Sequence, residues 1–387
     1  MKNFISIFFI FLSFSLCGIT QSQTVTQEWV ARYNGPGDSL DYARSLAIDG
    51  SGNVYVTGYS TGNGTGDDYA TIKYNSSGVQ QWAARYNGTG DSSDNAYSLA
   101  VDGLGNVYVT GSSWASGTST DYATIKYNSA GVQQWAARYN GSGNSYDEAS
   151  SLAVDDSGNV YVTGLSSGSG TLYDYATIKY NSAGVQQWVA RYNGPANSVD
   201  KARSLAIDGS GNVYVTGAST GSGTGYDYAT VKYNSAGVQQ WTARYNGQGN
   251  SYDEAYSLAV DGLGNVYVTG QSTGSGTSND YATIKYSQTT GITPISNEIP
   301  ERFSLSQNFP NPFNPATIIR FDIQKHGLVS LKVYDILGRV LSTLTNESLQ
   351  PGTYEADFDA SGITSGVYFY RLEANGFSDV KRMVLLK

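Results

Sequence analysis

The sequence is poor in the residues on which many catalytic and metal sites depend. It contains one cysteine, Cys17, and one histidine, His326, among 387 residues. Neither lies in the long repeated region, so a Ser-His-Asp triad, a Cys-His pair or a zinc site of the usual type is excluded there. His326 stands beside Gly327 in an expected turn, where a solvated loop residue is the ordinary interpretation. We therefore expect no metal, no cofactor and no catalytic residues.

Positive charge and proline are also scarce. The net charge is -9 without a basic tract, which excludes the electrostatic footprint of a nucleic-acid-binding protein or of one that binds anionic lipid. There are only 8 prolines but 46 glycines and 32 tyrosines. This composition favours an all-β protein of many short strands joined by tight turns.

The first 22 residues are typical of a secretory signal peptide. Lys2 precedes an apolar run from Phe4 to Leu16, which is too short to span a bilayer. The mature chain then has no transmembrane segment, and it has no disulfide because Cys17 is removed. A lipoprotein anchor at Cys17 is the competing interpretation, but Leu16 stands before it where a small residue is expected.

A repeat of 53 residues dominates the chain from residue 23 to residue 286. Its period is marked by five tryptophans: Trp29, Trp82, Trp135, Trp188 and Trp241. Four strand-like runs, 43–49, 53–60, 68–75 and 79–87, make one unit, and Gly-containing turns join the first to the second and the third to the fourth. Apolar and aromatic residues alternate on both faces, so each four-stranded sheet needs neighbours on both sides. A five-bladed β-propeller satisfies that requirement.

The ends of the repeat array predict how the ring closes. The last unit has three strands, 256–261, 265–272 and 280–286, and then loses the repeat pattern. The missing strand stands at the other end of the array, at residues 28–35. We expect this N-terminal strand to pair with the last three and leave no free edge. An open solenoid is the alternative.

Differences between the repeats cluster in the connections after the second and fourth strands, which lie on one face of an antiparallel blade. We predict that any ligand binds on this face. Sequence drift in loops without a functional constraint is the competing explanation of the same variation. The candidate residues on this variable face are Asp41, Tyr42, Asp94, Trp114, Asp147, Glu148, Asp200, Lys201, Asp253 and Glu254.

Other recurring residues have structural interpretations. The aspartates that end each first strand precede Gly-rich turns, where a carboxylate accepts backbone NH groups without a metal; they are Asp49, Asp102, Asp155, Asp208 and Asp261. Recurrent tyrosines, with Lys73 and Arg85, are interpreted as packing, ion and cation-π groups, and aromatic platforms for sugars are the alternative.

The repeated text SLAVDxxGNVYVTGxS followed by DYATIKYN resembles the SBBP group of bacterial β-propeller repeats over residues 25–286. That group is described as seven-bladed, whereas this chain has five units. The resemblance implies the propeller fold and says little about function, because propellers host unrelated activities.

After a predicted linker at residues 287–301, residues 302–387 show the alternation of a small immunoglobulin-like β-sandwich. They resemble the type A C-terminal sorting domain of the type IX secretion system. The motif residues are Pro310, Asn311, Pro312, Phe313, Asn314, Pro315, Gly338, Gly366, Tyr368, Lys381 and Lys387. The resemblance implies passage through the periplasm, contact with the type IX machinery and release or display at the outer surface.

These observations predict a secreted, non-enzymatic binding or scaffold protein. Its partner would be a glycan or a surface protein, recognised weakly at up to five similar sites. Five-bladed lectins of the tachylectin type are similar in architecture. A glycan-degrading enzyme with a central carboxylate pocket is one alternative, although near-identical blades supply symmetry instead of the unlike carboxylates that such chemistry needs. A purely structural surface component is the other.

Overall fold

The computed structural model describes residues 25–261, 264–287, 292–296 and 298–387. The predicted signal peptide, with Cys17, lies outside these residues. All regular elements described are β-strands, as the composition predicts. Within the described chain, no helix is long and apolar enough to cross a membrane.

The repeated region forms five consecutive antiparallel sheets. The first contains β1 (Asp41–Ile48), β2 (Val54–Thr61), β3 (Asp67–Tyr74) and β4 (Gln80–Tyr86), paired in chain order. The same order recurs in the next three sheets: β5 (Asp94–Val101), β6 (Val107–Ala115), β7 (Ser119–Tyr127) and β8 (Gln133–Tyr139); β9 (Asp147–Val154), β10 (Val160–Ser167), β11 (Tyr173–Tyr180) and β12 (Gln186–Tyr192); β13 (Asp200–Ile207), β14 (Val213–Thr220), β15 (Tyr226–Tyr233) and β16 (Gln239–Tyr245). The fifth sheet has three strands, β17 (Asp253–Val260), β18 (Val266–Thr273) and β19 (Asn279–Tyr286).

Tight turns fix the two short hairpins of each repeat. At the first, Asp49 Oδ1 accepts hydrogen bonds from the backbone NH groups of Ser51 and Asn53, both at 2.9 Å, and Gly52 has a φ of +76°. Such a backbone conformation favours glycine. These bonds confirm the structural interpretation of this aspartate.

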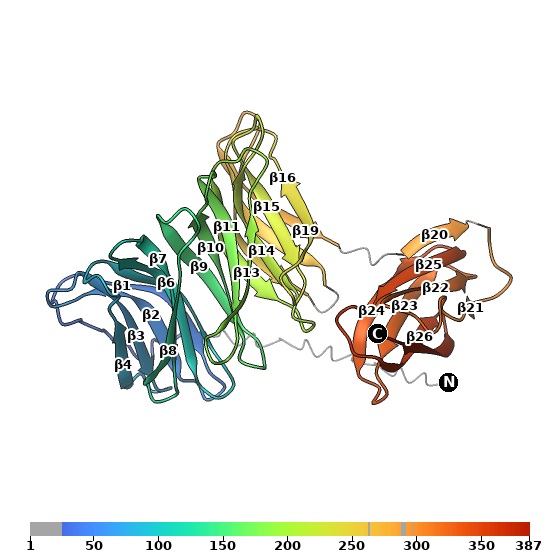
Figure 1. Ribbon diagram of the computed structural model, residues 1–387, viewed down its shortest axis with the longest axis horizontal. Coiled ribbons are helices and arrows are strands. Elements are labelled where there is room, and N and C mark those ends of the chain that lie inside the picture. The colour runs from blue at the N-terminus through green and yellow to red at the C-terminus, as the bar shows by residue number, and fades with distance from the viewer. Residues whose placement is uncertain (1–24, 262–263, 288–291, 297) are drawn as a thin grey trace, which may run out of the picture.

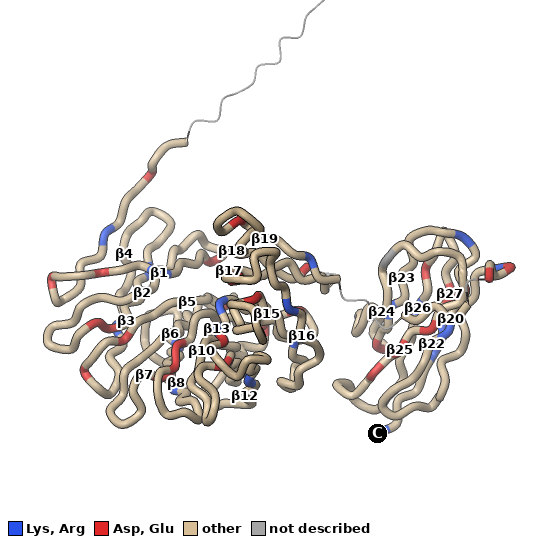
Figure 2. The backbone as a smooth tube through the Cα atoms, turned by 90° about the horizontal axis from the view of Figure 1, so that it is seen from above, with Lys and Arg blue, Asp and Glu red and all other residues tan. Residues whose placement is uncertain are grey.

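The sheets pack face to face, as the two-sided burial pattern predicts. Tyr55 and Tyr69 of the first sheet share one core with Val107, Val109 and Ile125 of the second, and all five side chains are fully buried. Equivalent cores join the later neighbours. The sheets follow one another in an arc, with β1, β5, β13 and β17 toward its middle (Figure 2).

The arc differs from the predicted closed ring. Residues 25–40 form no strand, and among the described residues no strand pairs with the outer edge of β19, which pairs with β18 on its other side. The predicted pairing between residues 28–35 and the last three strands is therefore not present. Strand content follows from local alternation, but closure depends on the rotation between successive sheets, and side-chain packing sets that rotation.

A separate β-sandwich follows the repeats (Figure 1). One sheet has the order β20 (Ile292–Ser296), β25 (Gly352–Asp359), β22 (Ala316–Ile323) and β21 (Ser304–Leu305). The other has the order β24 (Val340–Leu349), β23 (Gly327–Tyr334), β26 (Gly366–Ala374) and β27 (Phe377–Leu385). Both sheets contribute to one core. Residues 292–296 pair with β25, so this stretch of the predicted linker is an edge strand. The immunoglobulin-like description stays a prediction.

Candidate functional site

The aspartates predicted to rim the variable face are mostly buried. Asp94, Asp147, Asp200 and Asp253 are at most 1% exposed. Each accepts a hydrogen bond from the backbone NH of the glycine six residues earlier, at 2.6–2.8 Å, and Asp41 does so at 3.1 Å. Burial raises the pKa of Asp94, Asp147 and Asp200 above the usual range. The structure thus places these four carboxylates inside the loop before each first strand, and not on the exposed rim where the sequence analysis expected them.

An arginine network next to these loops is also structural. Arg85 donates to the Ser60 hydroxyl at 2.6 Å and to Asp68 Oδ2 at 2.8 Å. The same ion pair recurs in the following repeats as Arg138–Asp121, Arg191–Asp174 and Arg244–Asp227. Lys73 lies over the Tyr55 ring at 5.1 Å. The interpretation of the recurring arginine and lysine as ion-pair and cation-π groups is confirmed.

The chemistry that differs between repeats lies on the innermost strands. One variable position follows the aspartate directly, as Tyr42, Asn95, Glu148, Lys201 and Glu254. A second lies two residues further on, as Arg44, Tyr97, Ser150, Arg203 and Tyr256. We call six residues of the third to fifth repeats the inner-strand cluster: Tyr146, Glu148, Lys201, Arg203, Tyr252 and Glu254.

Glu254 is the most enclosed member of the cluster. It is 2% exposed, although it carries a charge. Arg203 Nε donates to its Oε1 at 2.6 Å, and the hydroxyls of Tyr252 and Tyr256 donate to its Oε2, the latter at 3.2 Å. Burial alone would raise the pKa of Glu254, but the hydrogen bonds from Tyr252 and Arg203 outweigh it and lower the pKa. Glu254 is therefore an ionised carboxylate that joins the fourth and fifth sheets.

Glu148 is more accessible and forms a similar arrangement. The Tyr146 hydroxyl donates to its Oε2 at 2.5 Å, and the Tyr146 ring meets Tyr173 edge-on, with 6.3 Å between centroids. Tyr252 meets Tyr226 in the same manner at 5.3 Å, and Lys201 Nζ lies 5.7 Å from the centre of the Tyr226 ring. Carboxylates, cations and tyrosine faces thus alternate over three sheets.

The remaining predicted residues lie apart from this cluster. Tyr42 packs on Tyr59 in the first sheet, with 5.0 Å between ring centroids. The ring of Trp114, in the second sheet, fills the space that a side chain at Gly90 would occupy. The sequence prediction included Glu148, Lys201 and Glu254 but missed Arg203, Tyr146 and Tyr252. The sequence did contain a signal for these three residues: the repeats differ at the position just before the loop aspartate and at the position three residues after it.

Hollows between the repeats lie at the opposite, constant hairpins. One of about 420 Å³ is lined by Asp49, Tyr55, Lys73 and Asp102, among others. Another of about 600 Å³ is lined by the equivalent residues one repeat later. In the first, Asp49 already accepts four hydrogen bonds from Ser51, Asn53 and Tyr55. Among the described residues there is no group of three or more His, Cys, Asp or Glu side chains that could hold a metal ion.

In the C-terminal sandwich, the proline-rich motif is held by the final strand. Phe313 is buried, its NH donates to Val384 O, and its carbonyl accepts from Leu386 N, both at 3.0 Å. The Tyr368 hydroxyl donates to Thr364 O at 2.6 Å. Lys387 Nζ donates to Ser361 O at 2.7 Å. Gly338 occupies a turn at a φ of +79°, whereas Gly366 and Lys381 lie in β26 and β27.

Comparisons with known proteins address both regions. A family described as "Beta-propeller repeat" (SBBP) matches residues 28–64, 81–117, 134–170, 187–223 and 240–276. A family described as "Secretion system C-terminal sorting domain" matches residues 307–386. No curated protein matches the chain.

Solved structures give weaker likenesses. A eukaryotic initiation factor is 11% identical, with 89% of each chain covered and a TM-score of 0.34. The tail fibre of a Staphylococcus aureus phage is 10% identical, with 86% of this chain and 88% of that chain covered and a TM-score of 0.27. At these scores the likenesses carry no argument about this chain.

Proposed function

Since this chain is a secreted protein built of five SBBP beta-propeller repeats and a type IX C-terminal sorting domain, we propose that it is a non-enzymatic binding protein displayed outside the cell. The sorting domain assigns the location, so the repeats carry whatever recognition occurs there. The inner-strand cluster is the surface we assign to it.

The observation that carries this proposal is the departure from symmetry at the cluster. The side chains that recur in every repeat already have partners within the fold. The aspartates accept loop NH groups, the arginines form ion pairs, and the tyrosines bond to the next sheet. Glu148, Lys201 and the tyrosines around them differ from repeat to repeat and gather on three neighbouring sheets. One ligand per array then fits better than five equivalent sites.

A hydroxyl-rich glycan is the ligand class we propose. Tyrosine faces supply stacking surfaces, and the Glu148 carboxylate and Lys201 ammonium supply an acceptor and donors for hydroxyl groups. The enzyme alternative is less well supported, because Glu254 is paired with Arg203 and is 2% exposed. A carboxylate so enclosed cannot meet a substrate as a general acid or a nucleophile.

Isothermal titration of the chain without residues 1–22, against glycans chosen by an array screen, tests the proposal. We expect a stoichiometry near one and an affinity at least tenfold weaker in Glu148→Gln and Tyr252→Ala. Tyr334→Ala, which removes a half-buried tyrosine of the sandwich, serves as the control and should bind as the wild type does. A stoichiometry near four would move the site to the hollows between the constant hairpins. Absence of any glycan binding would leave a protein partner or a scaffold role.

A further inference from the structure

Each contact between neighbouring sheets in the arc is made by the same bonds. Tyr69 Oη donates to Ala123 O at 3.2 Å, and Ser45 Oγ accepts from Leu99 N at 3.3 Å. The tyrosine bond recurs three times, as Tyr122–Ala176, Tyr175–Ala229 and Tyr228–Ala282. The serine bond recurs as Ser98–Leu152, Ser151–Leu205 and Ser204–Leu258. Every such contact has a donor-tyrosine face on the earlier sheet and a receiving face on the later one.

The fifth sheet presents the donor-tyrosine face without a neighbour. Tyr281 is the repeat equivalent of Tyr69 and Tyr228. Tyr281 is 98% exposed, whereas its four equivalents are 0% exposed. Tyr267, equivalent to the buried Tyr55, is also exposed. Moreover, no strand among the described residues pairs with the outer edge of β19, where a fourth strand pairs in each of the other four repeat sheets.

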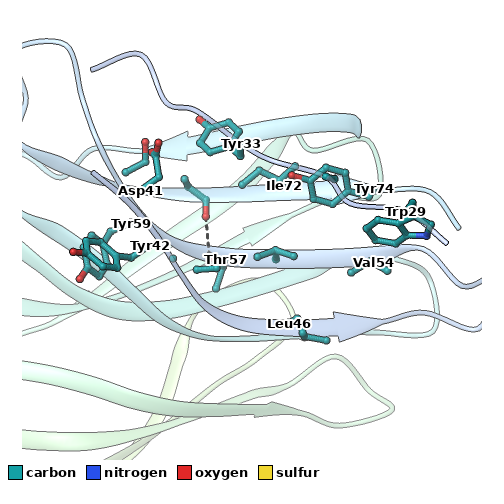
Figure 3. A pocket seen from close by; sticks show the side chains of 16 residues that line it. Trp29, Tyr33, Asp41, Tyr42, Leu46, Val54, Thr57, Tyr59, Ile72 and Tyr74 are labelled. Carbon is teal, nitrogen blue, oxygen red and sulfur yellow. Dashed lines mark hydrogen bonds between the residues drawn. The ribbon is translucent and has the colours of Figure 1, made fainter. Parts of the chain in front are cut away.

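The first sheet presents the receiving face without a neighbour. Leu46 is 64% exposed, whereas its equivalents Leu99, Leu152, Leu205 and Leu258 are 7–9% exposed. Beside Leu46 lies an apolar cavity of about 380 Å³, whose lining includes Val54, Ile72 and Tyr74 (Figure 3).

Residues 28–35 already lie where the fourth strand of a preceding sheet would lie. The Trp29 ring fills the space that a Cβ at Gly78 would occupy, as Trp82 does at Gly131. The ring of Trp29 also packs on Tyr74, with 6.4 Å between ring centroids, and Trp82 packs on Tyr127 in the same way, with 6.3 Å between centroids. At one end the chain therefore carries a segment equivalent to a fourth strand, without the three strands it would pair with. At the other end it carries three strands without their fourth.

We propose that these two ends join between molecules. The fifth sheet of one copy packs on the first sheet of a second copy, and residues 28–35 of the second copy pair with β19 of the first. In this contact Tyr281 meets Ala70 O, and Ser257 meets Leu46 N, by the 53-residue equivalence. The interface continues the contact that the arc already forms four times.

A second copy fits these ends better than the same chain does. The four existing contacts are densely packed, with fully buried side chains in each, and packed interiors resist changes of angle. Closing the gap within one chain would repack all four, whereas a second copy requires none of them to move. The head-to-tail contact is heterologous, so it forms rings or filaments according to the rotation per copy.

The variable inner-strand positions support this contact. Arg203 pairs with Glu254 at 2.6 Å, and this contact joins the second variable position of the fourth sheet to the first variable position of the fifth. At the end-to-end contact the corresponding pair is Tyr256 with Tyr42. Both are about half exposed in the single chain, at 47% and 48%. Two tyrosines can pack there without an unpaired charge.

Light scattering after size exclusion tests the proposal on the chain without residues 1–22. We expect the wild type to elute as a dimer or larger assembly that dissociates on dilution. Leu46→Glu and Tyr281→Glu, each at an exposed position, should fold normally by circular dichroism and elute as monomers. Val185→Glu is the control. Val185 is also apolar and exposed, but it lies on the hairpin between β11 and β12 of the third sheet, away from both ends of the array. This variant should assemble like the wild type.

Mixing the two monomeric variants separates the proposal from closure within one chain. Leu46→Glu keeps an intact fifth sheet, and Tyr281→Glu keeps an intact first sheet, so the mixture should form a heterodimer and nothing larger. A cysteine pair, Ser257→Cys with Leu46→Cys, should give disulfide-linked multimers. A monomeric wild type, a mixture without heterodimer, or a disulfide that forms only within one chain would overturn the proposal.

Discussion

Two positions carry an aspartate in every repeat, and the aspartate has opposite roles at the two positions. Asp155 caps a hairpin: burial alone would raise its pKa, but hydrogen bonds from Asn159, Tyr161 and Ser157 lower it. Asp147 is buried, and burial raises its pKa despite bonds from Gly141 and Ser167. The ionised carboxylate is thus favoured by the fold at Asp155 and disfavoured by it at Asp147.

The buried carboxylate at residue 147 should be needed for stability. Asp147→Asn places an NH₂ group where two backbone NH groups now donate, so at least one donor loses its partner. We expect the free energy of unfolding to fall by about 1–3 kcal/mol. Asp156→Asn, at an exposed position nearby, should leave it unchanged. Urea denaturation measures both, and equal stability of the two variants would contradict the loop-closing role.

The hairpin carboxylate at residue 155 should contribute to stability only above acidic pH. Its folded pKa lies below 3.8, the ordinary value for an aspartate, so the unfolded chain binds the proton more readily. Its contribution is present above about pH 4 and is lost as the pH falls through the folded pKa. Asp155→Asn should therefore lower the free energy of unfolding at pH 7. It should also reduce the further fall in that free energy as the pH drops below about 4. Denaturation at a series of pH values, again with Asp156→Asn as control, measures the difference.

At the scale of the element, a tryptophan joins neighbouring sheets by lying on a glycine hairpin. Trp82 of β4 packs between Tyr55 and Tyr127, and its indole NH donates to Ser129 O at 3.1 Å. Gly131, at a φ of +81°, lies directly under the ring. A hairpin of one sheet is thus fastened by the last strand of the sheet before it.

A methyl group under this ring should loosen the contact. A Cβ at Gly131 would lie 2.7 Å from Trp82, whereas one at Gly170, at a similar φ of +86°, would meet nothing within 4 Å. Gly131→Ala should then be less stable than Gly170→Ala by about 1–3 kcal/mol, because both share the backbone strain and only one overpacks. Thermal unfolding followed by tryptophan fluorescence measures the gap. Equal values for the two variants would show that the ring moves aside freely.

The strands of the repeat and their order were predictable because alternation and glycine turns are local signals. The roles of Asp94 and its equivalents were not, since a loop residue next to variable positions can point out or in. The sequence placed this aspartate at the loop, but only the structure shows that it accepts the Gly88 NH. The link between Arg203 and Glu254 was hidden for the same reason, as the two are 51 residues apart.

For the whole molecule, the repeats and the sandwich have separate cores. The sandwich core draws only on residues from Ile292 onward, and the repeat cores end at Tyr286. The presence of a sandwich and a long array could be predicted from composition and motifs. The opening between the first and fifth sheets could not, because small rotations add up over five nearly identical units.

Removal of the sorting domain should separate folding from export. A chain truncated after residue 301 retains all five sheets, so we expect it to fold and to accumulate in the periplasm. The full chain should reach the outside of the cell. Cell fractionation measures the location, and circular dichroism of the truncated protein provides the control for folding. Surface display of the truncated chain would contradict the role of residues 307–386.

The open arc also bears on how such a protein changes over generations. A closed ring admits only the number of blades that completes the circle, whereas an arc with free ends imposes no such count. In the described repeats the main contacts between sheets join successive sheets, so a duplication of 53 residues in the middle would insert one more sheet and leave both end faces unaltered. Because the repeats are almost identical in sequence, recombination between them keeps the reading frame and the hairpins. Length is then a property that selection can adjust one repeat at a time.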